Sequence, residues 1–177
     1  MKRTLVLTAA LLTLVVAPLV AGNDEHHTIK TRLSGYQETP QTINSPGSGE
    51  FKAKIRNGGT AIDYELTYRN LSSNITQSHI HFGRPATSGG VVLFLCTNLG
   101  NAPATVPVPQ ACPTTNPATI TGTLTAADVI ALSGQGIDSG EAGFAEILKA
   151  IGAGAAYVNV HTVTRGPGEI RGRLRGN

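Results

Sequence analysis

The chain has 177 residues, of which 14% are charged, and it contains 21 glycines, 10 prolines and two cysteines. Setting Lys2 and Arg3 aside as part of a leader leaves 12 of the 14 basic residues against 11 acidic ones, a net charge of +1. This near-neutral balance, with no basic cluster before the last seven residues, argues against nucleic acid as a partner. Abundant glycine and proline with few charges predict short strands and many turns.

The first 22 residues have the pattern of a secretory signal peptide. Lys2 and Arg3 precede an apolar run over residues 5–16, and the small residues Ala21 and Gly22 follow it. The run is shorter than the roughly 20 residues that a membrane helix needs. We therefore expect an exported protein, periplasmic or extracellular, with no membrane span after the leader is removed.

The rest of the chain has the length of one domain. Residues 1–22 are expected to be the signal peptide, residues 23–29 a polar N-terminal tail, and residues 30–175 a single domain.

Cys96 and Cys112 are the only cysteines. In an exported chain such a pair predicts a disulfide, here one that closes a proline-containing loop over residues 97–111. A pair of thiolate metal ligands is the weaker interpretation, because such ligands usually stand two to four residues apart and come in fours.

Alternation of apolar and polar residues, and short apolar runs between turns, predict up to eight strands. They fall at residues 27–33, 51–56, 62–69, 75–82, 91–95, 119–124, 156–161 and 169–174. Two short helices are expected before the last two strands. One begins at Thr125, where Asp128 suggests a capping box, and the other presents apolar residues at helical spacing between Phe144 and Ile151. Antiparallel strands packed as a sandwich or as a flattened barrel fit this pattern. The predicted fold is all-β: an antiparallel, Greek-key-like β-sandwich with two short helices inserted before the last hairpin.

Three stretches carry a resemblance to a known family. They are LSGYQETP (residues 33–40), QSHIHFG (77–83) and GAAYVNVHT (154–162), the last followed by GEIRG at 168–172. Together they resemble the CHRD domain, first described in chordin and common in bacterial secreted proteins, over about residues 30–175. The resemblance implies an extracytoplasmic module in single copy, and it implies no mechanism.

Histidines lie on two of the predicted strands. Side chains two positions apart leave the same face of a strand about 7 Å apart, so His79 and His81 share a face. On the later strand His161 shares a face with Tyr157 and Asn159. If the strands are neighbours, these groups form one polar cluster. The residues expected in a polar network there are Gln77, Tyr157, Asn159, Glu169 and Arg171.

Two interpretations of this cluster remain open. In the first and preferred one, the network satisfies the histidines, and the protein is a secreted, non-catalytic binding or structural module for an unknown extracytoplasmic protein or ligand. In the alternative, His79, His81 and His161 bind copper or zinc, with redox activity as one outcome, because imidazole suits both metals. No catalytic residue is assigned, and an enzyme is the less favoured class.

The segment from His79 to Gly83 is also similar to the copper strand of copper–zinc superoxide dismutases. The zinc loop of those enzymes is missing, and the two remaining histidines, His26 and His27, lie in the tail. Dismutase activity is therefore not expected.

Overall fold

A computed structural model describes residues 28–56 and 58–176. The expected signal peptide and residues 23–27 of the expected tail lie outside the described residues. Thr28 and Ile29, the last two residues assigned to that tail, already belong to the first strand. Within the described residues, no helix has both the length and the apolar character that crossing a bilayer requires.

Eight strands and one α-helix make up most of the described chain. The strands are β1 (Thr28–Ser34), β2 (Ser48–Arg56), β3 (Ala61–Arg69), β4 (Ile75–Phe82), β5 (Gly90–Thr97), β6 (Ala118–Thr125), β7 (Ala156–Thr162) and β8 (Ile170–Leu174). The helix is α1 (Gly140–Gly152), and three 3₁₀ turns are η1 (Gly35–Gln37), η2 (Ala126–Asp128) and η3 (Ser133–Gln135).

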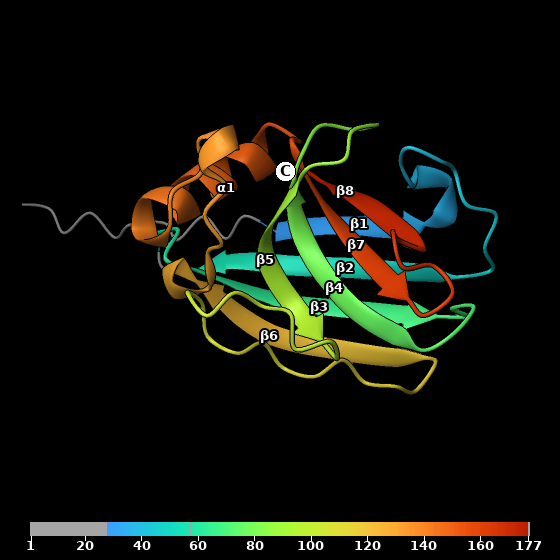
Figure 1. Ribbon diagram of the computed structural model, residues 1–177. Helices are drawn as coiled ribbons and strands as arrows, with labels where there is room; N and C mark the ends of the chain where they lie inside the picture. The colour runs from blue at the N-terminus through green and yellow to red at the C-terminus, as the bar shows by residue number, and fades with distance from the viewer. Residues whose placement is uncertain (1–27, 57, 177) are drawn as a thin grey trace, which may run out of the picture.

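The strands form one antiparallel sheet in the order β5-β4-β7-β8-β1-β2-β3-β6, curved into a nearly closed barrel (Figure 1). The mostly β, antiparallel character predicted from the sequence is confirmed, but the division into two sheets is wrong. The reason lies at β1, which pairs with β2 along its whole length. On its other side, Ser34 of β1 lies opposite Arg171 of β8, and Ile29 lies opposite Gly176, just after β8. Periodicity shows which face of a strand is buried but not which strands share hydrogen bonds, so it could not reveal this link.

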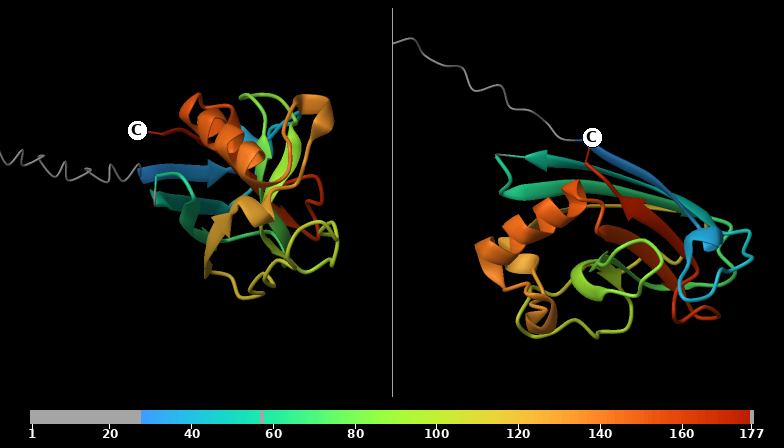
Figure 2. Two further views of the ribbon diagram at one scale, coloured as in Figure 1. Left: turned by 90° about the vertical axis from the view of Figure 1, so that its left-hand side faces the viewer. Right: turned by 90° about the horizontal axis from the view of Figure 1, so that it is seen from above.

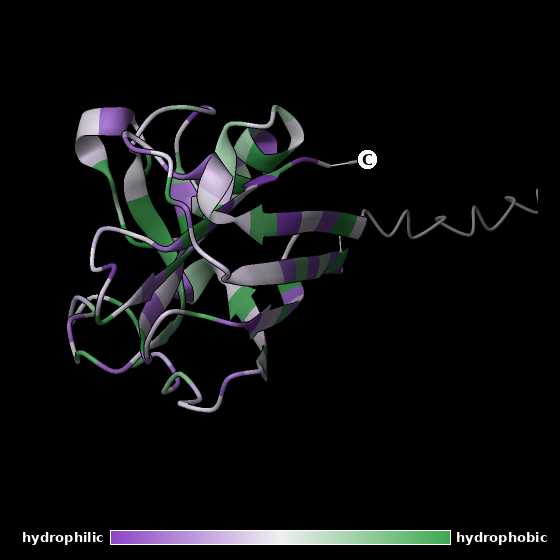
Figure 3. Ribbon diagram, turned by 90° about the vertical axis from the view of Figure 1, so that its right-hand side faces the viewer, coloured by the Kyte–Doolittle hydropathy of each residue, from purple (hydrophilic) through white to green (hydrophobic). Residues whose placement is uncertain are grey.

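Alternating side chains give the sheet a buried inner face. Phe51 and Ala53 on β2 pack inward with Leu66 on β3, while Lys52 and Lys54, the next residue after each, face solvent. Figure 3 shows this alternation as successive purple and green bands along the strands. The turn that joins β2 to β3 uses Gly58 and Gly59 at φ angles of +64° and +99°, which only glycine adopts without strain.

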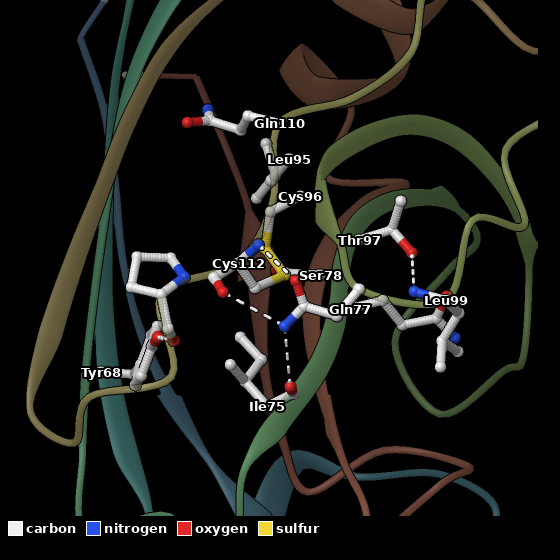
Figure 4. The surroundings of a disulfide bond; sticks show 12 residues. Tyr68, Ile75, Gln77, Ser78, Leu95, Cys96, Thr97, Leu99, Gln110 and Cys112 are labelled. Carbon is white, nitrogen blue, oxygen red and sulfur yellow. Dashed lines mark hydrogen bonds between the residues drawn. A yellow bond between two sulfur atoms is a disulfide. The ribbon is translucent and has the colours of Figure 1, made fainter.

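The disulfide between Cys96 and Cys112, predicted from the sequence, is confirmed. The bond, drawn in yellow in Figure 4, closes the loop over residues 97–111 that spans the two edge strands, β5 and β6. In this loop Gln110 Nε2 donates hydrogen bonds to the Tyr64 hydroxyl of β3 and to the Thr121 carbonyl of β6. The Tyr64 hydroxyl in turn donates to the Leu95 carbonyl of β5 at 2.7 Å. The loop thus bridges the remaining gap in the barrel.

Only one of the two predicted helices is an α-helix. α1 lies at one end of the sheet beside η2, as Figure 2 shows, and buries Phe144, Ile147 and Ile151. Burying each of these side chains stabilises the fold by about 1.5–3 kcal/mol. The Gly154 amide bonds to the Ile151 carbonyl at a φ of +64° and ends the helix.

The helix predicted from Thr125 is instead the short turn η2. Asp128 does accept hydrogen bonds from the amide and hydroxyl of Thr125, so the capping interaction is present. The helix does not continue because the amide of Ile130 bonds to the Val92 carbonyl of β5 and draws the backbone along the sheet edge.

Candidate metal centre

Pairing of β4 with β7 brings the three predicted histidines together. Gln77 lies opposite His161, His79 opposite Asn159, and His81 opposite Tyr157. All of these side chains leave the sheet on its outer face. Ile80 and Val158, which alternate with them, point the other way into the apolar core. His161 is therefore the diagonal neighbour of His79, a position within reach of a ring side chain.

Loops cover the cluster and bury it. The exposed fractions of His79, His81 and His161 are 2%, 9% and 7%. The His79 ring lies between the other two, with centroids 5.4 Å from His81 and 5.0 Å from His161. Taking one ring nitrogen from each histidine, the three atoms lie within 4.8 Å of one another.

Only two of the six ring nitrogens of these histidines have a hydrogen-bond partner among the described residues. His81 Nδ1 and His161 Nδ1 donate to the carbonyl oxygens of Gly89 and Gly166, at 2.9 and 2.8 Å. A carbonyl oxygen only accepts, so Nδ1 carries the proton and Nε2 keeps its lone pair. Both Nε2 atoms, and both ring nitrogens of His79, are buried without a hydrogen-bond partner.

Burial keeps the three imidazoles neutral. Desolvation, together with the neighbouring His161 and His81, lowers the pKa of His79 to about 2. Desolvation also lowers the pKa of His81 to about 4, against the opposing effect of its bond to Gly89, and lowers the pKa of His161. Neutral imidazole is the form that coordinates a metal ion.

An aromatic and cationic layer lies beside His81. The Tyr157 ring stacks on His81 at 4.6 Å and 6° from parallel, and Arg171 Cζ lies 3.4 Å from the centroid of the Tyr157 ring. The Tyr157 hydroxyl accepts a hydrogen bond from the amide of Gly89, whose carbonyl binds His81. This layer fixes the orientation of the His81 ring.

Asn159 links the cluster to a buried carboxyl group. Its Nδ2 donates to Glu38 Oε1 at 2.8 Å, while its Oδ1 has no partner. Desolvation raises the pKa of Glu38 to about 7, although the bond from Asn159 and the charge of Arg171 oppose the shift.

The five network residues predicted from the sequence divide into two groups. Tyr157, Asn159 and Arg171 surround the histidines as described. Gln77 accepts instead from Asn101 Nδ2 at 2.8 Å, away from the rings. Glu169 is buried at 0% exposure and accepts from Ser45, Ser72 and Thr162, so it makes no hydrogen bond with a histidine.

Sequence reasoning missed four contributors: Phe94, Glu38 and the carbonyl groups of Gly89 and Gly166. Phe94 lies opposite His79 on β5 and meets its ring edge-on at 4.5 Å, between two register shifts that accompany His79 and His81. Bulges of this kind are common beside functional sites. A carbonyl group has no sequence signal, and Glu38 is 121 residues from Asn159.

These features define a β-rich domain, closed by a disulfide, with a buried three-histidine cluster on the outer face of its sheet. The family model of the CHRD domain matches residues 29–174, so the chain belongs to the CHRD domain family. The searches of curated proteins and of solved structures found no match.

Proposed function

We propose that the protein binds a copper or zinc ion through His79, His81 and His161. The observation that carries this proposal is that four of the six ring nitrogens are buried without a partner while the other two are held by backbone carbonyls. We assign no catalytic step to the site.

The geometry lies close to that of a bound ion. With metal–nitrogen bonds of 2.0–2.1 Å, tetrahedral donors stand about 3.3 Å apart. The three nitrogens lie within 4.8 Å of one another, so binding an ion would bring them closer by about 1.5 Å at most. The carbonyl groups of Gly89 and Gly166 accept from the Nδ1–H of His81 and His161, as backbone carbonyls commonly do beside metal-binding histidines. They leave the Nε2 lone pairs of His81 and His161 available to a common ion.

The unpartnered nitrogens favour this function over a purely structural network. A buried polar atom without a partner costs about 1–3 kcal/mol, so a cluster kept only for stability should satisfy its rings. Here neither Asn159 nor Glu169 bonds to a histidine. Coordination would satisfy the Nε2 atoms of His81 and His161 and one nitrogen of His79.

We further propose that the site works outside the cytoplasm, in a periplasm or beyond the cell. The disulfide between Cys96 and Cys112 is consistent with export, since such bonds persist in oxidising compartments. In this proposal the metal ion is the extracytoplasmic ligand, and no protein partner is needed to explain the cluster.

Titration of the purified protein with Zn(II) and Cu(II), followed by calorimetry, tests the function. We expect one ion per chain with a dissociation constant below about 1 µM. His161→Ala should weaken binding at least about 100-fold with an unchanged circular dichroism spectrum. The Cu(II) complex should show electron paramagnetic resonance splitting from several imidazole nitrogens.

The matched control is the double variant His26→Ala/His27→Ala, which removes the only other histidines of the chain. It should bind as the unaltered protein does. Loss of binding in this control, or wild-type binding weaker than about 100 µM, would contradict the proposal.

A further inference from the structure

A cleft of about 830 Å³ opens beside the histidine cluster. It lies between the segment that follows β1, the loop after β4 and the outer face of β8. The aromatic and charged residues that line it include Tyr36, Glu38, Tyr157, Arg171, Arg173 and Arg175. The volume is within the range of sites for small organic ligands.

Positive charges are concentrated along one wall of this cleft. Arg171, Arg173 and Arg175 alternate along β8 and the residue after it, so their side chains share one face of the sheet. Lys30 of β1 also lines the cleft. Against these four cations, Glu38 is the one carboxyl group that lines it among residues 28–56 and 58–176.

Strand pairing brings further positive charges close to this wall of the cleft. The two bridges between β1 and the C-terminal segment, Ser34 with Arg171 and Ile29 with Gly176, share one antiparallel register. That register places Arg32 opposite Arg173 and Lys30 opposite Arg175. Like charges directly opposite each other destabilise a sheet.

The carboxylates in the described part of the chain neutralise little of this positive charge. Lys30 contacts Glu50 at 3.4 Å, but among residues 28–56 and 58–176 no carboxylate oxygen lies within 4.0 Å of Arg32, Arg173 or Arg175. The repulsion between these positively charged side chains would be relieved when an anion occupies the cleft.

Arg171 supplies a directed group in addition to charge. Arg171 is only 4% exposed, and its guanidinium carbon Cζ lies over the Tyr157 ring, 3.4 Å from the centroid. Among the described residues, it makes one hydrogen bond, from Nη2 to the Arg84 carbonyl at 3.3 Å. The remaining N–H groups form a planar fork that matches a carboxylate or phosphate group.

We propose that this cleft binds a small organic anion that carries two or more carboxylate or phosphate groups. One group pairs with the fork of Arg171, and another lies between Arg173 and Arg175. The site adjoins the histidine cluster through Tyr157 but does not depend on a metal ion.

Two probes test the proposal with metal-stripped protein in low-salt buffer: tricarballylate for carboxylates and inorganic pyrophosphate for phosphates. We expect at least one to bind with a dissociation constant below about 1 mM and to weaken as salt is added. Amide resonances of Tyr36 and Arg173 should shift. The probe that binds more tightly identifies the anionic group.

The double variant Arg173→Gln/Arg175→Gln should weaken binding by about tenfold or more, because it removes two cations without touching the buried Arg171. Arg69→Gln is the matched control: Arg69 is an exposed arginine on β3 that does not line the cleft, and its loss should change affinity less than about twofold. Equal weakening in this control, or no binding of either probe at about 10 mM, overturns the proposal.

His161→Ala separates this inference from the metal function. It removes a proposed metal ligand but no residue that lines the cleft. Unchanged anion binding in this variant supports an independent site, and loss of anion binding with an intact fold overturns it.

Discussion

His81 and Tyr157 face each other across β4 and β7, with their rings stacked 4.6 Å apart. Arg171 lies against the same tyrosine ring, and its charge contributes to lowering the pKa of His81, after burial as the main cause. The cluster thus has a cation close by and no carboxylate bonded to a histidine. This arrangement favours the neutral form of the three imidazoles near pH 7, which is the form that would coordinate a metal ion.

His79→Leu should stabilise the metal-free protein. Both ring nitrogens of His79 are buried without a partner beside Phe94, so an apolar side chain of similar size removes a penalty of about 1–3 kcal/mol. Urea unfolding after removal of metal measures the difference. Zinc at 100 times its dissociation constant should then stabilise the unaltered protein by about 2.7 kcal/mol and the variant by far less.

Replacing the neighbouring Ser78 provides a control in which the free energy of unfolding should fall instead of rise. Its hydroxyl is fully buried but donates to the Asn159 carbonyl at 2.8 Å. Ser78→Ala should therefore lower the free energy of unfolding by about 1 kcal/mol and leave zinc affinity unchanged. If His79→Leu instead destabilises the metal-free protein as Ser78→Ala does, the His79 nitrogens have partners and the basis of the metal proposal is lost.

Gly89→Ala should weaken metal binding without removing a ligand. A methyl group at this position would collide with the Phe82 carbonyl, so the loop must move and take with it the carbonyl group that orients His81. Loss of an acceptor that orients a histidine ligand through its other ring nitrogen typically costs about 10–100-fold in metal affinity. Calorimetric titration with zinc measures it.

Gly134→Ala serves as the comparison for this variant, since a methyl group there meets no atom within 4 Å. It should bind zinc as the unaltered protein does. Equal affinities for the two variants would show that the Gly89 carbonyl does not position His81.

The sequence predicted the strands well because each has a distinct inner and outer face. β2 and β3 alternate along nearly their whole length, and the glycines between them specify the turn. Whether β1 would join two sheets into one depended on pairing between segments far apart in the chain. Single-sequence periodicity carries no information about such pairing, so it could not decide between a two-sheet sandwich and a nearly closed single sheet.

The same limit applies to the site. Alternation correctly placed His79 and His81 on one face, and His161 with Tyr157 on one face of another strand. The network around them was only partly foreseen, because Glu169 and Gln77 found partners in loops. Which loop reaches a strand face is decided by tertiary packing.

Replacing the disulfide should destabilise the fold where the loop over residues 97–111 bridges β5 and β6. Cys96 and Cys112 are separated by 16 positions, and the loop they close carries Gln110, which bonds across to β3 and β6. Cys96→Ser/Cys112→Ser should lower the free energy of unfolding by about 3 kcal/mol, from the greater freedom of the unfolded chain. Hydrogen exchange should quicken first at β5 and β6. A loss below about 1 kcal/mol would show that the loop holds itself in place without the bridge.

Glu169→Gln should change how stability depends on acid. Burial alone would raise the pKa of Glu169, but hydrogen bonds from Ser45, Thr162 and Ser72 outweigh it, and the pKa is lowered. Its carboxylate therefore stabilises the fold above the unfolded-state pKa of about 4.3, and this contribution is lost as the pH falls through the lower folded-state value. The variant should be less stable by about 1–3 kcal/mol at pH 7. Its stability should also fall less steeply below pH 4.3, and a parallel pH profile would contradict the assignment.

Glu38→Gln should have the opposite effect on the pH profile. Burial raises the pKa of Glu38 to about 7, so the folded protein favours the protonated form, and stability is lost as the pH rises from the unfolded-state value through 7. A neutral amide removes this loss and still accepts the hydrogen bond from Asn159. Urea unfolding at pH 8 should show the variant more stable by about 3 kcal/mol or less, with little difference at pH 4. Lower stability of the variant at pH 8 would mean that the ionised carboxylate is held by Arg171 strongly enough to offset its burial.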